Sequence, residues 1–258
     1  MSKVADINAD FPHKKPVYQR WNIHHRLAHF GIYSMFILCA ATGLPIKFHH
    51  KAWARSFAEF FGGGDGLLAW HLFGGVMLFM VALYHLGYSA LFAIKNRHNL
   101  EIPMLPWSKG TWTALKQYFR YQLGKSDEHP KFGRYQWKEM FDYWAVFWGM
   151  VIIGGSGLLM WFPEFTMQLF PKWFVDAYRW GHSDEAVLAV SFIFTWHFYN
   201  VHFQPDFFPM SWTWWDGNIS LEVMELEHGL ELEMLKEKDA QAGKGTPSAP
   251  TKGFPSSG

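Results

Sequence analysis

The chain has 258 residues and a formal net charge of +1, and its mean hydropathy of −0.08 is that of a soluble protein. The average conceals an uneven pattern, because 50% of the residues are hydrophobic and the charged residues are confined to a few segments. The basic residues form no patch, so we predict no nucleic-acid partner. The single cysteine, Cys39, excludes an internal disulfide, a four-thiolate iron–sulfur cluster and a Cys-x-x-Cys-His haem attachment within this chain.

Four runs lack Asp, Glu, Lys and Arg: residues 27–46, 66–94, 143–163 and 186–205. Each run reaches the ~20 residues with which an α-helix crosses the hydrocarbon core of a bilayer. We therefore predict an all-α integral membrane protein, a four-transmembrane-helix bundle inserted in the lipid bilayer. The alternative is a soluble protein with four buried core helices. Gly43 and Pro45 predict that the first helix ends near them.

Polar segments between and around these runs define the domain organisation. Residues 1–26 form a basic N-terminal segment, whose polar start predicts no cleavable signal peptide. Residues 27–205 form the transmembrane domain, with a cytoplasmic connection at 95–140 and a short outer connection at 164–181. Residues 206–258 form a C-terminal tail, disordered from about 243 because Gly, Pro and Ser dominate there. An amphipathic helix is expected in "MLPWSKGTWTALKQYFRYQL", and an acidic helix in "LEVMELEHGLELEMLKEK".

The distribution of Lys and Arg predicts the orientation. The N-terminal segment carries five, and nine more lie between Lys95 and Lys138, against five on the two other connections. Because cytoplasmic loops hold the excess of positive residues, both termini are predicted to be cytoplasmic. The expected location is the inner (cytoplasmic) membrane, with several passes.

Histidines recur along the predicted helices, and six of them are candidate ligands: His29, His71, His85, His182, His197 and His202. The second and fourth helices both run from the outer to the inner side. His71 therefore shares the outer level with His182, and His85 shares the inner level with His197.

Matched imidazoles on two parallel helices suit two stacked haems b, each iron taking an axial nitrogen from either side. Polar side chains inside a bilayer are costly and usually functional. Arg26, together with Arg20, is placed to meet haem propionates at the inner surface. Structural histidines with local hydrogen bonds are the plain alternative. A zinc site fits less well, because tetrahedral zinc needs its ligands clustered.

Three stretches resemble known helices: "RLAHFGIYSMFILCAATGLPIKF", "WHLFGGVMLF" and "GHSDEAVLAVSFIFTWHFYNVH". They are similar to the first, second and fourth helices of the di-haem cytochrome b subunits of membrane formate dehydrogenases and nickel–iron hydrogenases, and the resemblance covers roughly residues 17–220. It implies that His71 and His182 hold an outer haem, and His29 and His197 an inner one. Depth alone instead pairs His85 with His197 and leaves His29 and His202 nearer the cytoplasm. Both pairings stay open, and the surplus histidines leave room for a third haem.

The resemblance also implies a quinone near the inner haem, where Tyr199, Asn200 and His202 are candidates to bind it. A helix cap or an interfacial anchor is the alternative for each. The expected function is an electron-transfer subunit of an oxidoreductase complex, with no catalytic centre of its own. Electrons would pass between the membrane quinone pool and a partner, an iron–sulfur protein or a multihaem cytochrome c. The alternative is a non-redox membrane anchor or a small transporter with a histidine proton relay.

Overall fold

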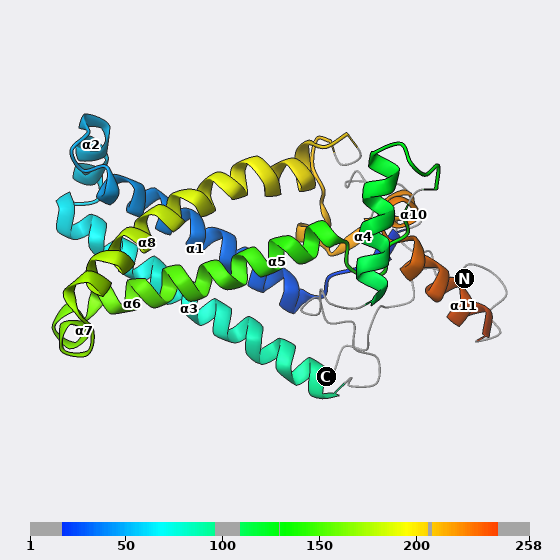
Figure 1. Ribbon diagram of the computed structural model, residues 1–258, viewed down its shortest axis with the longest axis horizontal. Coiled ribbons are helices and arrows are strands. Elements are labelled where there is room, and N and C mark those ends of the chain that lie inside the picture. Colours follow the sequence, from blue (N-terminus) through cyan, green and yellow to red (C-terminus); the bar gives the residue numbers. More distant parts are fainter. Residues whose placement is uncertain (1–16, 96–108, 129, 206–207, 242–258) are drawn as a thin grey trace, which may run out of the picture. The chain divides into compact units, whose positions relative to one another are not determined.

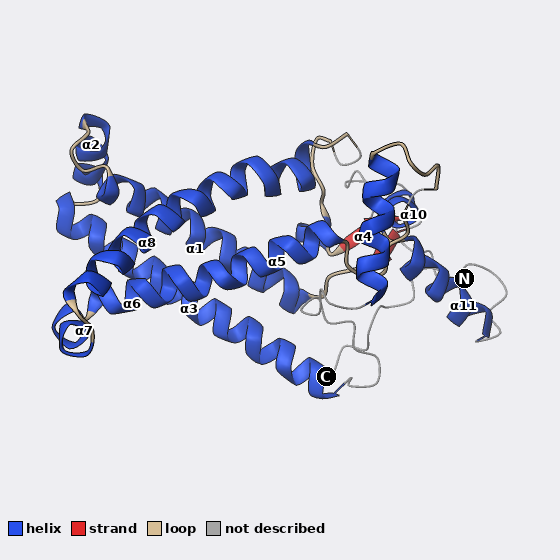
Figure 2. Ribbon diagram, in the orientation of Figure 1, coloured by secondary structure: helices blue, strands red, loops and turns tan. Residues whose placement is uncertain are grey.

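The computed structural model describes residues 17–95, 109–128, 130–205 and 208–241. Helices account for most of these residues, and the described strands form one short pair (Figure 2). The tail predicted to be disordered from 243 lies outside the described residues, as do residues 1–16. The chain divides into two compact units. We call them the bundle unit, 27–95 with 145–204, and the polar unit, which takes in 1–26, 96–144 and 205–258.

Within the described residues, four helical segments are long and apolar enough to cross a membrane: Ile23–Lys47, Gly63–Lys95, Trp137–Trp161 and Lys172–Phe203. Few of their side chains are buried; Phe79 and Leu188, for example, are 55% and 61% exposed. Water would oppose so large an apolar surface, whereas lipid solvates it. The four-helix membrane architecture predicted from the charge-free runs is therefore confirmed.

The bundle unit is built from these segments and two short helices. Its elements, which Figure 1 labels in part, are α1 (Ile23–Lys47), α2 (Ala52–Phe60), α3 (Gly63–Lys95), η1 (Met150–Gly154), α6 (Gly155–Trp161), α7 (Pro163–Leu169), α8 (Lys172–Phe192), η2 (Ile193–His197) and η3 (Tyr199–Phe203). The close approach of α1 to α3 needs glycine, since a Cβ on Gly31 would lie 2.8 Å from Val81 and one on Gly74 would lie 3.0 Å from Cys39 Sγ. On the other side, α8 packs against η1 and α6.

The first helix ends at Lys47, close to Gly43 and Pro45, where the sequence predicted its end. Pro45 lies in the last turn, where its missing N–H removes only one helical bond, and Phe48 N still donates to Leu44 O at 2.9 Å. The outer connection is shorter than predicted, because α7 occupies part of it and the fourth spanning segment already begins at Lys172.

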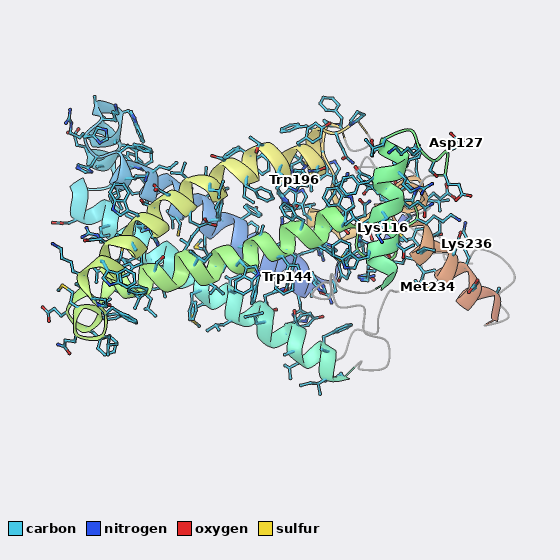
Figure 3. The ribbon with its side chains drawn as sticks, in the orientation of Figure 1. Lys116, Asp127, Trp144, Trp196, Met234 and Lys236 are labelled. Atoms are coloured by element: carbon cyan, nitrogen blue, oxygen red, sulfur yellow. The ribbon has the colours of Figure 1, made fainter. Side chains whose placement is uncertain are left out.

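The polar unit joins segments that are far apart in the sequence. Its described elements are β1 (Val17–Gln19), α4 (Lys109–Gln122), α5 (Trp137–Gly149, which continues into the bundle unit), α9 (Thr213–Asp216), β2 (Asn218–Ser220), α10 (Leu221–Glu227) and α11 (Gly229–Gln241). β1 pairs antiparallel with β2, with Tyr18 opposite Ile219. Ile219, Met224 and Leu232 form a small buried core. Exposed charged side chains such as Lys116, Asp127 and Lys236 cover its surface (Figure 3). Both helices predicted from sequence in this unit are present, as α4 and as α10 with α11.

Buried ion pairs also hold the polar unit together. Arg20 contacts Glu139 and Glu231, each at 3.1 Å, and its side chain is only 5% exposed. Arg134 pairs with the same Glu231 at 2.7 Å. These contacts tie the N-terminal segment, the connection before α5 and the C-terminal helix α11 into one body. The Arg20 guanidinium, which sequence reasoning placed near a propionate, is thus engaged by carboxylates of its own unit.

Candidate functional site

His71 and His182 face each other at the end of the bundle unit that the distribution of Lys and Arg predicts to be the outer one; we call this depth the outer level and that of His29 and His197 the inner level. His71 lies on α3 and His182 on α8; their ring centres are 6.2 Å apart and their planes make an angle of 80°. Both side chains are half-buried. The structure therefore brings together the two histidines that the sequence placed at one depth.

A buried hydroxyl group holds each of these two rings. Thr42 Oγ1 on α1 lies 3.0 Å from His71 Nδ1. Ser156 Oγ on α6 lies 3.2 Å from His182 Nδ1, which also contacts the Ile153 carbonyl at 2.9 Å. Both contacts use Nδ1, so in each ring the hydrogen-bonded edge is turned toward a neighbouring helix. Thr42 and Ser156 were not predicted as site residues from the sequence. Each immediately precedes a glycine on a helix that faces a histidine, and this pattern could have indicated them.

Those two glycines allow the rings to lie close to the helix backbone. A Cβ on Gly43 would lie 2.9 Å from His71 Cε1, and one on Gly157 would lie 3.1 Å from His182 Cε1. A side chain at position 43 would displace the His71 ring, and one at position 157 would crowd the His182 ring. Glycine is needed at these positions for space, since neither residue has a positive φ.

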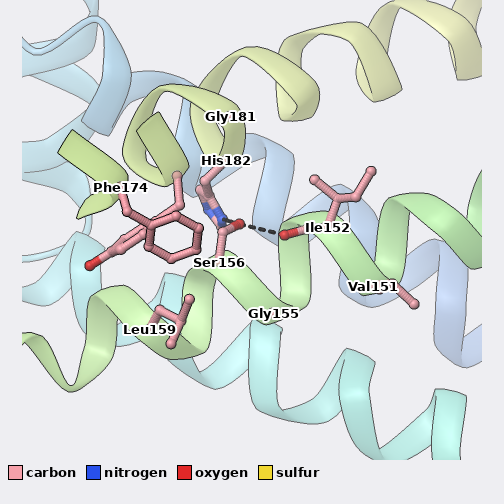
Figure 4. A pocket seen from close by; sticks show the side chains of 9 residues that line it. Val151, Ile152, Gly155, Ser156, Leu159, Phe174, Gly181 and His182 are labelled. Atoms are coloured by element: carbon pink, nitrogen blue, oxygen red, sulfur yellow. Dashed lines mark hydrogen bonds between the residues drawn. The ribbon is translucent and has the colours of Figure 1, made fainter. Parts of the chain in front are cut away.

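A cavity of about 300 Å³ opens beside His182. Figure 4 shows Ser156 and His182 close together in its lining, to which Phe174 and Leu159 also belong. Gly155 and Gly181 also line it and leave the backbone accessible there. A mostly apolar cavity beside one imidazole suits a flat apolar group that binds through that imidazole.

An ion pair fastens α1 to α8 next to this cavity. Lys47 Nζ lies 2.5 Å from Asp184 Oδ1 and 2.9 Å from Ser183 Oγ. Ser183 and Asp184 directly follow His182 in the chain. The contact therefore fastens the fourth spanning segment to α1 directly after His182, and with it the height of His182 against α1.

At the inner level, His29 on α1 meets His197 in η2. Their ring centres are 6.5 Å apart and their planes make an angle of 43°. His29 is also within electrostatic range of His202. His85 lies half-buried on α3, fourteen residues after His71. The ring contact described at the inner level thus matches the His29–His197 pairing.

The π-helical turns change the position of His202. In an ideal α-helix, a residue five positions after His197 would point about 140° away. Both residues lie in consecutive π-helical segments, η2 and η3, where hydrogen bonds join residues five apart. Residues five apart then lie near the same face, so the π-helical turns bring His202 near the face that carries His197. His202 Nδ1 is buried and has no hydrogen-bond partner among the described residues.

Arg26 lies in the first turn of α1, three residues before His29. The two side chains therefore lie near the same helix face. The terminal nitrogen of Arg26 donates to the Trp215 carbonyl at 2.7 Å. Its Nε is buried and has no hydrogen-bond partner in the part of the chain that is described. A buried donor without a partner is costly, and an anionic group would satisfy it.

The two histidine pairs fit a metal held between imidazoles. With metal–nitrogen bonds of ~2 Å on both sides, the two ring centres come to lie about 6 Å apart. The measured separations are 6.2 Å and 6.5 Å. Among the described residues, no group of three or more His, Cys, Asp or Glu side chains could hold a metal ion. The donor set therefore fits bis-imidazole iron in a macrocycle and does not fit a tetrahedral zinc site.

Comparison with known proteins agrees with this geometry. No curated protein matches the chain. A family model described as prokaryotic cytochrome b561 matches residues 20–207, most of the chain and all four spanning segments. This confirms the resemblance to membrane cytochromes b of the nickel–iron hydrogenase type and implies that the chain binds haem b. The chain belongs to the prokaryotic cytochrome b561 family and is a multi-pass membrane b-type cytochrome of electron transport.

Proposed function

We propose that the chain conducts electrons through two bis-histidine haems b, as the membrane subunit of a respiratory oxidoreductase complex. The observation that carries the proposal is the pair of imidazole contacts, with ring centres 6.2 Å apart at the outer level and 6.5 Å apart at the inner level. Family membership accounts for haem b and electron transport, and it leaves no support for a non-redox anchor or transporter.

In this proposal His71 and His182 hold the outer haem, and His29 and His197 hold the inner one. A bound haem supplies one-electron redox chemistry. The protein's part is to hold neutral imidazoles at fixed separation and to exclude water with the apolar side chains of four helices. Arg26 would give its buried Nε–H to a propionate of the inner haem.

Quinone chemistry would take place at the inner end of the fourth spanning segment. His202 offers a buried Nδ1 without a hydrogen-bond partner among the described residues. Tyr199 is 53% exposed, and Asn200 uses its amide N–H to cap the Trp196 carbonyl at 2.9 Å, which leaves the amide oxygen as an acceptor. A hydrogen-bond donor next to an iron ligand is what reduction of a quinone carbonyl requires. Among Tyr199, Asn200 and His202, we therefore propose His202 as the residue that donates a hydrogen bond to the quinone.

The proposal also assigns the orientation of the chain in the membrane and the class of its redox partner. The basic N-terminal segment and connection would place the polar unit and both termini in the cytoplasm, with the protein in the inner membrane. The outer haem would then exchange electrons with an extracytoplasmic subunit, either an iron–sulfur protein or a multihaem cytochrome c. The inner haem would exchange them with the quinone pool.

Single histidine substitutions test the ligand assignment. The full chain is purified from the membrane, and haem b per chain is measured together with a potentiometric titration of the reduced spectrum. His71→Ala and His182→Ala should each remove the same one of two components, and His29→Ala and His197→Ala should each remove the other.

His85→Ala separates the two inner pairings. Retention of both haems supports His29 as the partner of His197, whereas loss of the inner haem together with its retention in His29→Ala would assign that role to His85. His49→Ala is the control, because His49 is an exposed outer histidine that the proposal does not use. Retention of both haems in His71→Ala and in His182→Ala would overturn the outer assignment.

A further inference from the structure

The two outer histidines are held by the same local arrangement on two different helices. On α1, Thr42 contacts His71 through its hydroxyl, and Gly43 makes room for the ring. On α6, Ser156 and Gly157 stand in the same relation to His182, which also contacts the Ile153 carbonyl. The repetition indicates a common task for the two hydroxyl–glycine pairs.

The direction of these hydrogen bonds follows from counting protons. A hydroxyl group has one proton to give, and a backbone carbonyl has none. Thr42 Oγ1 lies 2.7 Å from the Leu38 carbonyl, and Ser156 Oγ lies 2.5 Å from the Ile152 carbonyl, so each hydroxyl proton is used there. Both hydroxyl oxygens must then accept from the histidines.

The proton count fixes the tautomer of both rings. His71 and His182 each face acceptors at Nδ1, so each carries its proton on Nδ1. A neutral imidazole has one N–H and one lone pair, which leaves the lone pair on Nε2. In each ring, Nε2 is therefore the nitrogen available to bind iron.

We propose that Thr42 and Ser156 are positioning residues for the outer haem: they hold His71 and His182 as Nδ1–H tautomers and keep the midpoint potential of that haem low. The inference rests on the assignment of these histidines as its ligands. A hydrogen bond accepted from Nδ1–H makes the imidazole a stronger donor to the metal. A stronger donor favours the ferric over the ferrous state, so loss of the hydroxyl should raise the potential.

The test is a redox titration of the full chain purified from the membrane. Thr42→Val with Ser156→Ala removes both hydroxyls while nearly keeping the side-chain volumes. We expect two haems per chain, with one component shifted to a higher potential by up to about tenfold in the ferric-to-ferrous equilibrium. For a one-electron couple, tenfold corresponds to about 59 mV. The shifted component should be the one that His71→Ala removes.

Three control variants make the result specific. Thr42→Ser keeps a hydroxyl and should keep the wild-type potential. Thr166→Val removes a fully buried hydroxyl that bonds only to backbone carbonyls in the described contacts, and Ser191→Ala removes an exposed one bonded to the Val187 carbonyl at 2.8 Å. Both should leave the two potentials unchanged.

Two results would contradict the inference. The first is that the double variant Thr42→Val with Ser156→Ala keeps both haems at their wild-type potentials. The second is that Thr166→Val or Ser191→Ala shifts a haem potential as much as the double variant does. If Thr42→Val loses the outer haem, Thr42→Ser decides: retention there supports a role for the hydroxyl, and loss in both variants shows that only side-chain packing matters. A failure of the ligand assignment is recognised separately, because His71→Ala and His182→Ala would then retain both haems.

Discussion

His228 is the most deeply buried histidine among the described residues, with 1% exposure. It lies in the polar unit, where its Nδ1 donates to the Gly133 carbonyl at 3.0 Å and its Nε2 is 4.0 Å from Glu139. Burial lowers the pKa of His228 below its ordinary value of 6.5, and the charge of Arg20 lowers it further, against the opposing pull of Glu139 and Glu231. The folded unit therefore contains the neutral ring.

This burial predicts how the stability of the polar unit depends on pH. Because the folded-state pKa is lower, the stabilisation is fully present above about pH 6.5 and is lost as the pH falls below it, where the unfolded chain takes up a proton. His228→Asn keeps a donor for the Gly133 carbonyl and removes the titration. The free energy of local opening of residues 221–241, obtained from hydrogen exchange after correction for the intrinsic exchange rate at each pH, should therefore decrease less in this variant than in wild type as the pH falls from about 7.5 to 5.

The exposed His50 provides the control, since His50→Asn should retain the wild-type pH dependence. An unchanged pH dependence in His228→Asn would show that another group, such as Glu139, controls the acid response.

At the scale of single residues, the candidate histidines could be identified from the sequence, but the hydroxyl groups that hydrogen-bond to them could not. Imidazoles in charge-free helices stand out because they are costly in lipid. Thr42 and Ser156 do not stand out, because a hydroxyl in a spanning helix can satisfy itself with the carbonyl four residues earlier, as Ser191 does. Thr42 and Ser156 differ from Ser191 only because α1 and α6 pack against His71 and His182, which the sequence does not reveal.

At the scale of elements, two ion pairs connect the segment before α5 to α11 and differ mainly in burial. Arg134 and Glu231 are 17% and 12% exposed, whereas Lys131 and Glu233 are 60% and 52% exposed. Removing one partner of a buried pair leaves a charge without its counterion, at a cost of about 3 kcal/mol. An exposed pair contributes about 0–1 kcal/mol.

We therefore expect Glu231→Gln, which removes the carboxylate that the buried Arg20 and Arg134 both contact, to lower the free energy of local opening of α11 by about 3 kcal/mol. The matched substitution Glu233→Gln, in the exposed pair with Lys131, should lower it by less than about 1 kcal/mol. Native-state hydrogen exchange of α11 measures both. Similar effects in the two variants would show that the core around Leu232, rather than the buried charges, holds α11 in place.

Helix periodicity and charge-free runs predicted the spanning segments but not their internal irregularities. The π-helical turns η2 and η3 carry His197 and His202, and a strict 3.6-residue period placed these side chains on different faces. A π-turn depends on which side chains must meet the neighbouring helices, so the local sequence does not mark it.

At the scale of the whole molecule, the N-terminal segment, the second connection and the C-terminal tail fold into one unit. Segments packed together in this way must lie on the same side of a bilayer. The excess of Lys and Arg in them predicts that this side is the cytoplasm. The sequence could predict their common side from charge, but not the pairing of β1 with β2, since a three-residue strand has no distinctive pattern.

Thiol labelling of intact cells tests this orientation. In a Cys39→Ser background, a membrane-impermeant reagent should modify Lys51→Cys, an exposed position before α2, and leave Asp127→Cys unmodified. Both positions should react once the membrane is permeabilised. Labelling of Asp127→Cys alone in intact cells would reverse the assignment of the two sides.

Haem stoichiometry tests the central claim most directly. The full chain, purified from the membrane of cells with intact haem synthesis, is assayed for non-covalent haem b per chain and for its reduced spectrum. Two imidazole pairs at 6.2 Å and 6.5 Å predict two haems per chain, each with the spectrum of bis-imidazole iron. A folded preparation with one haem or none, or with a spectrum of five-coordinate iron, would contradict the account.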